Sequence, residues 1–280
     1  MSSQSQKMLD QIKRATQTVG EADALLISAG AGMGVDSGLP DYRGTKGFWN
    51  AYHGIGNSSQ SFFELANMDM FEHNPLQAWA FYGQRLNQYR DAKPHSGFQQ
   101  LLEVGRQKPN GFFVMTSNVD GQFQIAGFED GKIEECHGSI HYLQCSRPCS
   151  DDVWDAKDVD IFVDEEKFQA MGDLPRYPRC AAIARPNILM FYDGAWVNKR
   201  TKAQEDRLWV WLEGLMEGRR LVIVEIGAGT VISTIRQRSE YYASLHFAPL
   251  IRINPNDYHV SSKRHISLPL SGIDGINSIC

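Results

Sequence analysis

The sequence predicts an α/β fold, a doubly wound, parallel, Rossmann-like sheet into which a smaller lobe is inserted. Short apolar runs that end at Gly, Asn or Asp alternate with helical segments along the 280 residues. This alternation is typical of a parallel sheet with helices on both faces. A glycine-rich turn follows the first apolar run, where α/β proteins bind dinucleotides. Residues 45–70 and 151–200 break the alternation, so we expect them in the smaller lobe.

The individual elements are expected from local patterns. Short apolar runs predict strands at residues 24–28, 112–116, 132–135, 221–226 and 250–253. Apolar residues at helical spacing and capping signals predict helices at residues 8–19, 75–89, 94–105 and 202–217. Asn74 and Pro75 are typical of a helix start, and Gly218 is typical of the residue that ends a helix.

The composition argues against several classes of protein. A formal net charge of −5 does not suit a nucleic-acid-binding surface. The chain contains no run of 18 apolar residues, so we expect no membrane-spanning helix. The first residues lack the apolar core of a signal peptide. Five cysteines, an odd number, favour reduced thiols over disulfides. We therefore expect a cytoplasmic protein with neither a nucleic-acid nor a membrane partner.

Three glycines, Gly30, Gly32 and Gly34, follow the first expected strand. Because they lack a Cβ, they let backbone N–H groups approach a phosphate. Their G-x-G-x-G spacing differs from the usual dinucleotide fingerprint, and no acidic residue stands where that fingerprint places one for a ribose. Residues 40–43, Pro-Asp-Tyr-Arg, add opposite charges and an aromatic ring. A glycine turn with solvated charges is the alternative interpretation.

Two more polar blocks follow expected strands. Asn118 and Asp120 come directly after the second strand, and His137 and Gly138 come after the third. The carboxyl ends of parallel strands share one edge of a sheet, so these side chains should face the crevice beside the glycine turn. A neutral imidazole suits general-base chemistry near pH 7, and Gly138 leaves space for a substrate. Ordinary turn residues and a structural histidine are the alternatives.

The blocks GAG, SGLPDYRG, T-x-N-x-D and HG, in this order, resemble the motifs of the sirtuins, the NAD-dependent protein deacylases. Residues 185–193, RPNILMFYD, resemble the family segment that pairs with the substrate peptide. The loop at residues 227–230 and the pair Ile253-Asn254 resemble family contacts to the nucleotide. The resemblance covers about residues 20–260.

The resemblance implies an NAD-binding domain of residues 1–46, 90–141 and 216–280. A small lobe of residues 47–89 and 142–215 would combine a helical segment with a zinc-ribbon-like segment. The implied NAD-binding residues are Gly30, Ala31, Gly32, Met33, Asp41, Tyr42, Arg43, Ser117, Asn118, Asp120, Gly227, Ala228, Gly229 and Asn254. The implied catalytic residues are His137, which takes a proton from a ribose hydroxyl, with Asn118 and Asp120. Phe191 and Tyr192 would contact an acyl-lysine protein or peptide, whose acyl group is transferred to ADP-ribose as nicotinamide leaves.

The chain departs from the sirtuin pattern near the expected site. Ser117 stands where most sirtuins have glutamine, and Gln122-Phe123 stands where they have leucine-histidine. The run TSNVDGQF is similar to that of the macrodomain-linked sirtuins, which resemble ADP-ribosyltransferases but lack the catalytic histidine. Two alternatives to deacylation therefore stay open: protein ADP-ribosylation, and NAD binding or hydrolysis without deacylation.

The expected metal site also departs from the family pattern, in which two C-x-x-C pairs hold a structural zinc. Cys145 and Cys149 are one residue further apart than usual, and Tyr177 replaces the first cysteine of the pair that ends at Cys180. Three thiols are one ligand short of a tetrahedral site. A nearby Asp, a His such as His141, or water would complete it. The alternative is that zinc is lost and the thiols are simply packed.

Tyr82 and Arg85 lie three residues apart in the helix expected at residues 75–89, so they share a helix face. Arginine is suited to binding a carboxylate through two hydrogen bonds. Sirtuins that prefer succinyl- or malonyl-lysine carry Y-x-x-R in the corresponding helix, and the resemblance implies that Tyr82 and Arg85 contact the acyl group. A packed tyrosine with a solvated arginine is the alternative.

Overall fold

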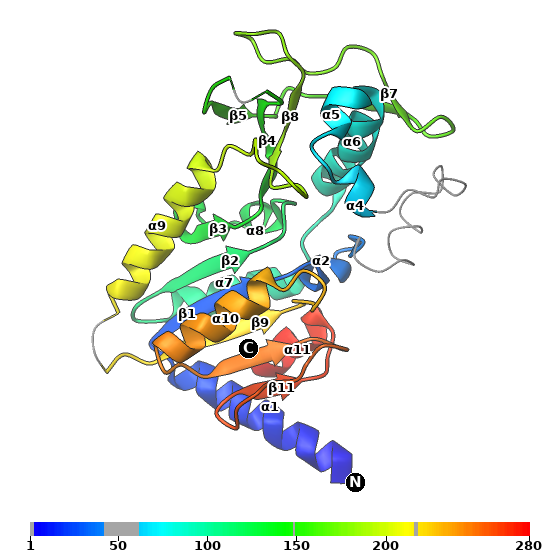
Figure 1. The fold of residues 1–280 in the computed structure, drawn as a ribbon. Coiled ribbons are helices and arrows are strands. Elements are labelled where there is room, and N and C mark those ends of the chain that lie inside the picture. Colours follow the sequence, from blue (N-terminus) through cyan, green and yellow to red (C-terminus); the bar gives the residue numbers. More distant parts are fainter. Residues whose placement is uncertain (1–2, 42–61, 148, 216–217) are drawn as a thin grey trace.

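A parallel six-stranded sheet is the centre of the computed structural model, which describes residues 3–41, 62–147, 149–215 and 218–280 (Figure 1). Its strands are β1 (Ala24–Ala29), β2 (Phe112–Thr116), β3 (Ile133–Glu135), β9 (Leu221–Ile226), β10 (Leu250–Ile253) and β11 (Ile266–Leu268). They lie in the order β3-β2-β1-β9-β10-β11, and every neighbouring pair is parallel. This strand order is the Rossmann order, so the predicted fold class is confirmed.

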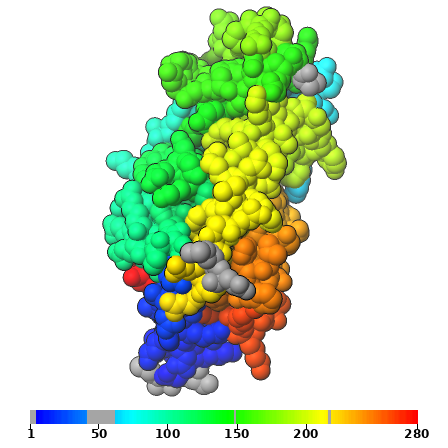
Figure 2. All heavy atoms as spheres, turned by 90° about the vertical axis from the view of Figure 1, so that its left-hand side faces the viewer, coloured from blue at the N-terminus to red at the C-terminus, as the bar shows by residue number. Residues whose placement is uncertain are grey.

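Helices cover both faces of this sheet. Successive side chains of a strand point to opposite faces, and in β1 Leu25 and Ile27 pack in one core while Leu26 packs in the other. The first face carries α1 (Ser3–Glu21), α7 (Ser96–Arg106) and α11 (Gly272–Ile279), and the second carries α9 (Lys199–Glu213) and α10 (Thr234–Leu245). Figure 2 shows α9, in yellow, lying between the green residues of the smaller lobe and the orange residues of α10.

The smaller lobe lies above the sheet in the view of Figure 1. Its helices are α4 (Phe62–Leu65), α5 (Met70–His73) and α6 (Pro75–Asp91), and its strands are β4 (Gly138–Cys145), β5 (Val153–Asp155), β6 (Phe162–Asp164), β7 (Gln169–Met171) and β8 (Ala184–Ile188). β4 pairs antiparallel with β5 and β8, and β6 pairs with β7. The buried Trp79 of α6 donates a hydrogen bond to the carbonyl of Ala184 in β8 at 2.9 Å, which joins the helices to the strands.

Several predicted elements differ from the observed ones. The helix predicted at residues 202–217 begins at Lys199 and ends at Glu213, with Gly214 as the cap. Lys132 belongs to a short 3₁₀ helix (Asp130–Lys132) before β3. β11, α10, α11 and the antiparallel strands were not predicted, nor were the short helices α2 (Gly32–Val35) and α8 (Gln122–Ile125). The domain boundaries stay a prediction, and β4 runs across the one placed after residue 141.

Among the described helices, none is both long enough and apolar enough to cross a membrane.

Candidate functional site

The two central loops of the sheet meet where the strand order reverses, between β1 and β9. A Cβ on Gly32 would lie 2.7 Å from the Cα of Gly227, and one on Gly30 would lie 2.7 Å from the Cα of Ala228. The N–H of Gly30 donates to the carbonyl of Ile226 at 2.9 Å, and that of Gly32 donates to Gly227 at 3.0 Å. These glycines therefore serve the close packing of two loops. The N–H groups of Gly30 and Gly32 donate hydrogen bonds to the end of β9 and to the loop after it. The sequence had suggested that these N–H groups approach a phosphate.

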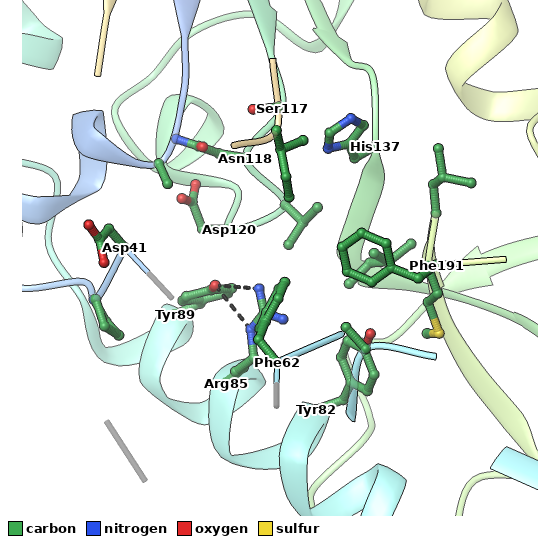
Figure 3. A pocket seen from close by; sticks show the side chains of 18 of the residues that line it. Asp41, Phe62, Tyr82, Arg85, Tyr89, Ser117, Asn118, Asp120, His137 and Phe191 are labelled. Carbon is green, nitrogen blue, oxygen red and sulfur yellow. Dashed lines mark hydrogen bonds between the residues drawn. The ribbon is translucent and has the colours of Figure 1, made fainter. Parts of the chain in front are cut away.

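A cavity of about 400 Å³ lies between the carboxyl ends of the strands and the smaller lobe (Figure 3). We call it the first cavity; Ser117, Asn118, Asp120 and His137 line it together with residues of α6 and of the segment after β8. The residues predicted to be catalytic therefore share one cavity. The amide of Asn118 donates to the carbonyl of Gly30 at 3.0 Å, which ties the end of β2 to the glycine turn after β1.

Asp120 is a buried carboxyl group that lines the first cavity, with 7% of its surface exposed. Its Oδ1 accepts a hydrogen bond from the N–H of Gln122 at 3.0 Å. Burial raises the pKa of Asp120 to about 6, although the Gln122 N–H and the Arg85 cation act in the opposite direction. A carboxyl group with such a pKa changes its charge close to neutral pH.

His137 lies in the turn that joins β3 to β4, so it stands where the large sheet passes into the smaller lobe. Backbone hydrogen bonds hold this turn, because the N–H of Leu189 donates to the His137 carbonyl at 2.9 Å. The imidazole Nε2 lies 3.2 Å from the hydroxyl of Thr234. The next residue, Gly138, has φ +77°, and a Cβ there would lie 2.0 Å from the Asn187 carbonyl oxygen. The pairing with β8 thus requires glycine at position 138.

Helix α6 forms one wall of the first cavity. Tyr82 and Arg85 are both buried and both line the cavity. The guanidinium of Arg85 donates to the Tyr89 hydroxyl, at 3.2 Å from Nε and 2.8 Å from Nη2, and lies 5.7 Å from the centre of the Tyr82 ring. Figure 3 shows Arg85 on this wall, with Asp120 across the cavity. The alternative of a solvated arginine is wrong, because Arg85 is enclosed by aromatic rings.

The segment after β8 forms the opposite wall. Phe191 lines the first cavity, and Tyr192 does so while remaining 94% exposed. Asp193 anchors the segment, because its two carboxylate oxygens accept hydrogen bonds from Arg185 at 2.7 and 2.8 Å, and both side chains are fully buried. The N–H of Met190 also donates to Asp193. The segment that carries the exposed Tyr192 is thus fixed by a buried ion pair.

A second cavity, also of about 400 Å³, lies where the loops after β1, β9 and β10 meet. Gly32, Gly227, Gly229, Thr230, Asn254 and Asp257 line it, and Ala31 and Asp41 line both cavities. The amide of Asn254 donates to the carbonyl of Ala228 at 3.0 Å, which fixes one loop against another.

Some predicted cofactor residues do not line either cavity. Gly30, Met33 and Ala228 are not among the lining residues of either cavity, and the Met33 side chain is fully buried in the core of the sheet. Tyr42 and Arg43 lie outside the described residues. Tyr89, Thr234 and Asp257 were not among the predicted site residues, and Asp193 appeared only as the end of the run at residues 185–193. The four-residue spacing of Arg85 and Tyr89 on one helix face was an available signal for Tyr89.

Three cysteines gather at the far end of the smaller lobe. The Sγ atoms of Cys145, Cys149 and Cys180 lie 3.3, 3.5 and 3.6 Å apart. Tyr177 is buried beside them; it stacks on Trp154 and donates its hydroxyl hydrogen bond to the carboxylate of Asp152.

His141 does not belong to this cysteine group. Its Nε2 lies 2.9 Å from the carbonyl oxygen of Asp120, at the other end of β4. The suggestion that His141 is a fourth metal ligand is therefore wrong. Within the part of the chain that the structure describes, the metal-ligand group is limited to the three thiols.

Residues 30–208 match the sequence model of a family described as "Sir2 family". A curated relative named "NAD-dependent protein deacylase" from Aquifex aeolicus is 25% identical over 232 residues, which is 81% of this chain and 82% of the relative. A relative of the same name from Thermus thermophilus is 24% identical over 279 residues, 96% of this chain and 93% of the relative.

Solved structures share the fold. A Sir2 homologue bound to NAD has a TM-score of 0.68 and 20% identity, and the match covers 95% of this chain and 92% of that chain. A structure titled "Structural Basis for the Mechanism and Regulation of Sir2 Enzymes" has a TM-score of 0.67 and 22% identity, with 97% of both chains covered.

Proposed function

Because this chain belongs to the Sir2 family, we propose that its first cavity catalyses the NAD-dependent removal of acyl groups from protein lysine. Relatives that match over most of their length carry the name NAD-dependent protein deacylase. The observation that supports the proposal most is that Asn118, Asp120 and His137 line one cavity between the nucleotide sheet and the smaller lobe. The products are nicotinamide and O-acyl-ADP-ribose.

The two cavities fit an elongated dinucleotide, because they adjoin at Ala31 and Asp41. Cavities of this size are typical of small-molecule sites. Gly229 and Asn254 would hold the adenosine part in the second cavity, while Ser117 and Asn118 would hold the nicotinamide ribose in the first. Bound NAD supplies the ADP-ribose that accepts the acyl group and the nicotinamide that leaves.

The polar residues of the first cavity have separate tasks. A ring nitrogen of His137 accepts a proton from a ribose hydroxyl, which is general-base catalysis. The carboxyl group of Asp120 is largely ionised above pH 6 and places a negative charge where positive charge develops on the sugar. Asn118 is oriented by the Gly30 carbonyl and positions the ribose. The walls of α6 and of residues 189–193 exclude water from the acyl-lysine.

Product analysis tests the proposal directly. The protein is incubated with NAD and acyl-lysine peptides, and the products are separated by mass. O-acyl-ADP-ribose together with deacylated peptide supports deacylation. ADP-ribosylated protein would assign the site to transfer onto protein, and free ADP-ribose with intact acyl peptide would assign it to NAD hydrolysis.

A dicarboxylic acyl group fits the first cavity better than acetyl. Arg85 is a buried cation on the cavity wall, and its guanidinium is oriented by the Tyr89 hydroxyl. A succinyl or malonyl carboxylate would accept a charge-assisted hydrogen bond from this guanidinium, which acetyl cannot do. Burial raises the pKa of Tyr82 to about 12, so its hydroxyl stays protonated and available as a donor beside Arg85.

We propose that the cysteine cluster holds zinc weakly as a structural metal, because three thiolates leave a tetrahedral site one protein ligand short. A tetrahedral site with Zn–S bonds of ~2.3 Å has sulfur atoms ~3.8 Å apart, close to the 3.3–3.6 Å separations of Cys145, Cys149 and Cys180. Three thiolates would hold the ion and join the loops after β4 and β7. The fourth position would be filled by water, since Tyr177 is engaged with Asp152.

A further inference from the structure

Helix α10 reaches the candidate base, and this contact defines a role that the proposed reaction does not yet include. Thr234 is the first residue of α10, and its hydroxyl lies 3.2 Å from Nε2 of His137. Both side chains are partly buried. A hydroxyl can donate to a ring nitrogen that carries a lone pair and accept from one that carries a proton. Thr234 can therefore stay bonded to the imidazole in both protonation states.

A second contact holds α10 against the segment that carries His137, so that the Thr234 hydroxyl stays within hydrogen-bond distance of the imidazole. Arg238 lies one helical turn after Thr234, and residues four apart share a helix face. Arg238 pairs with Glu134, three residues before His137, through both carboxylate oxygens, with 2.9 Å between Nη2 and Oε2. The Glu134 side chain is 1% exposed. The ion pair and the Thr234–His137 bond thus join the same helix face to the same short segment.

We infer that Thr234 is a positioning residue for His137, held in place by the Arg238–Glu134 pair. The inference deepens the proposed function, since it concerns the same base. A hydrogen bond from a charged imidazolium is stronger than one made by neutral imidazole. The Thr234 oxygen therefore stabilises the protonated ring, makes His137 a better proton acceptor, and fixes the orientation of the ring toward the ribose.

Other charged groups lie near the same imidazole, and their effects have to be separated from that of Thr234. Asp41, Arg85, Asp120 and Asp193 line the first cavity, and the Glu134–Arg238 pair lies behind His137. Asp120 is the one with a pKa of about 6, in the range where an imidazole titrates. Burial raises the pKa of the neighbouring Cys136 to about 12, so that thiol stays neutral.

The test combines Thr234→Val, which keeps the shape and removes the hydroxyl, with Thr234→Ser, which restores it. We expect Thr234→Val to lower the titration midpoint of His137, followed by NMR of the ring, by about 0.3–1 pH unit. Deacylation kcat should fall about three- to tenfold, with unchanged affinity for NAD. Thr234→Ser should restore most of the His137 titration midpoint and most of kcat. Thr18→Val on α1, where the hydroxyl bonds only the Arg14 carbonyl, is the matched control.

The NMR titration is repeated in the Asp120→Asn background to remove the overlapping carboxyl. An unchanged His137 titration in Thr234→Val, or equal loss in Thr234→Val and Thr234→Ser, would overturn the inference. The ring titration needs no turnover, so it also separates the two proposals. A Thr234-dependent titration in a protein that forms no O-acyl-ADP-ribose would support the positioning role while refuting deacylation.

Discussion

The first cavity and the cysteine cluster both collect side chains from distant parts of the sequence, but the fold holds them in different ways. Asn118 and His137 follow buried strands, and hydrogen bonds to the backbone fix the segments that carry them. Cys149 and Cys180 are exposed, whereas Cys145 and Tyr177 beside them are buried. Strand ends give the accurate positions that a catalytic site needs, whereas the cluster combines two exposed thiols with a packed aromatic ring.

The first cavity and the cysteine cluster therefore contribute to different properties of the protein. Residues of the first cavity should change the reaction while leaving the fold largely intact. Residues of the cluster should change the stability of the smaller lobe while leaving the chemistry largely intact. Four substitutions test this separation.

His137→Ala should have the largest effect. We expect deacylation to fall by about 10²–10⁴-fold, the range for loss of a general base. The His137 side chain is only partly buried, so Tm should change little. The increase in Tm on adding NAD, which reports binding by mass action, should remain. Deacylation at nearly the wild-type rate would show that His137 is not the base.

Arg85→Met should remove a preference for succinyl-lysine. A hydrogen bond to a charged group contributes about 1.5–3 kcal/mol, which corresponds to about 10–150-fold in kcat/KM over acetyl-lysine. Acetyl-lysine activity should be retained. Arg90→Met is the control, because Arg90 on the same helix donates to the carbonyls of Val159 and Ala156. Equal succinyl and acetyl rates in the wild type would return Arg85 to a structural role.

Asp120→Asn should lower turnover less than His137→Ala does and yet stabilise the protein near neutral pH. Burial raises the pKa of Asp120 from 3.8 to about 6, so the folded protein holds this proton more tightly than the unfolded chain. Its contribution to stability is therefore present below pH ~4 and is lost as the pH rises to ~6, a change on the order of 3 kcal/mol. Asparagine stays neutral and can still accept from the Gln122 N–H.

Urea unfolding of wild type and Asp120→Asn at pH 4.5 and pH 7.5 measures this change. The free energy of unfolding of the variant should exceed that of the wild type by more at pH 7.5 than at pH 4.5. A stability difference that is the same at both pH values would contradict the raised pKa.

Tyr177→Cys should have the smallest effect on chemistry. We expect the wild type to bind zinc substoichiometrically or not at all, and the variant to bind more zinc with a higher Tm, because a fourth thiolate closes the site. Without zinc the variant should be less stable than the wild type, since it loses the Trp154 stack and the Asp152 bond. Metal analysis and Tm with and without a chelator measure this, with Tyr177→Phe as the control. Full, tight zinc in the wild type would reveal another fourth ligand.

The sequence predicts the centre of this fold well, because buried parallel strands are continuous apolar runs. β1, β2, β9 and β10 appear in it as such runs, each followed by a polar or glycine loop. β11 has only three residues, Ile-Ser-Leu, so no local pattern distinguishes it from a loop. Its pairing with β10 makes it a strand. The antiparallel pairing of β4 with β8 likewise depends on contacts between distant segments.

The site was predictable in its residue types and less so in their surroundings. Strand ends placed Asn118, Asp120 and His137 correctly at one edge, because topology alone brings them together. The enclosure of Arg85 by rings and the position of His141 away from the thiols depend on how α6 and β4 pack. Spacing along the sequence does not encode these contacts.

Asp41 and Ala31 line both cavities, so a ligand bound in one cavity can change the affinity of the other cavity for its ligand. Thermodynamic linkage requires the effect to be reciprocal. If an acyl peptide in the first cavity tightens the binding of a nucleotide in the second, the nucleotide tightens the binding of the peptide by the same factor. A residue on the common wall can therefore change the affinity for each ligand in the presence of the other, without contacting any atom whose bonds change.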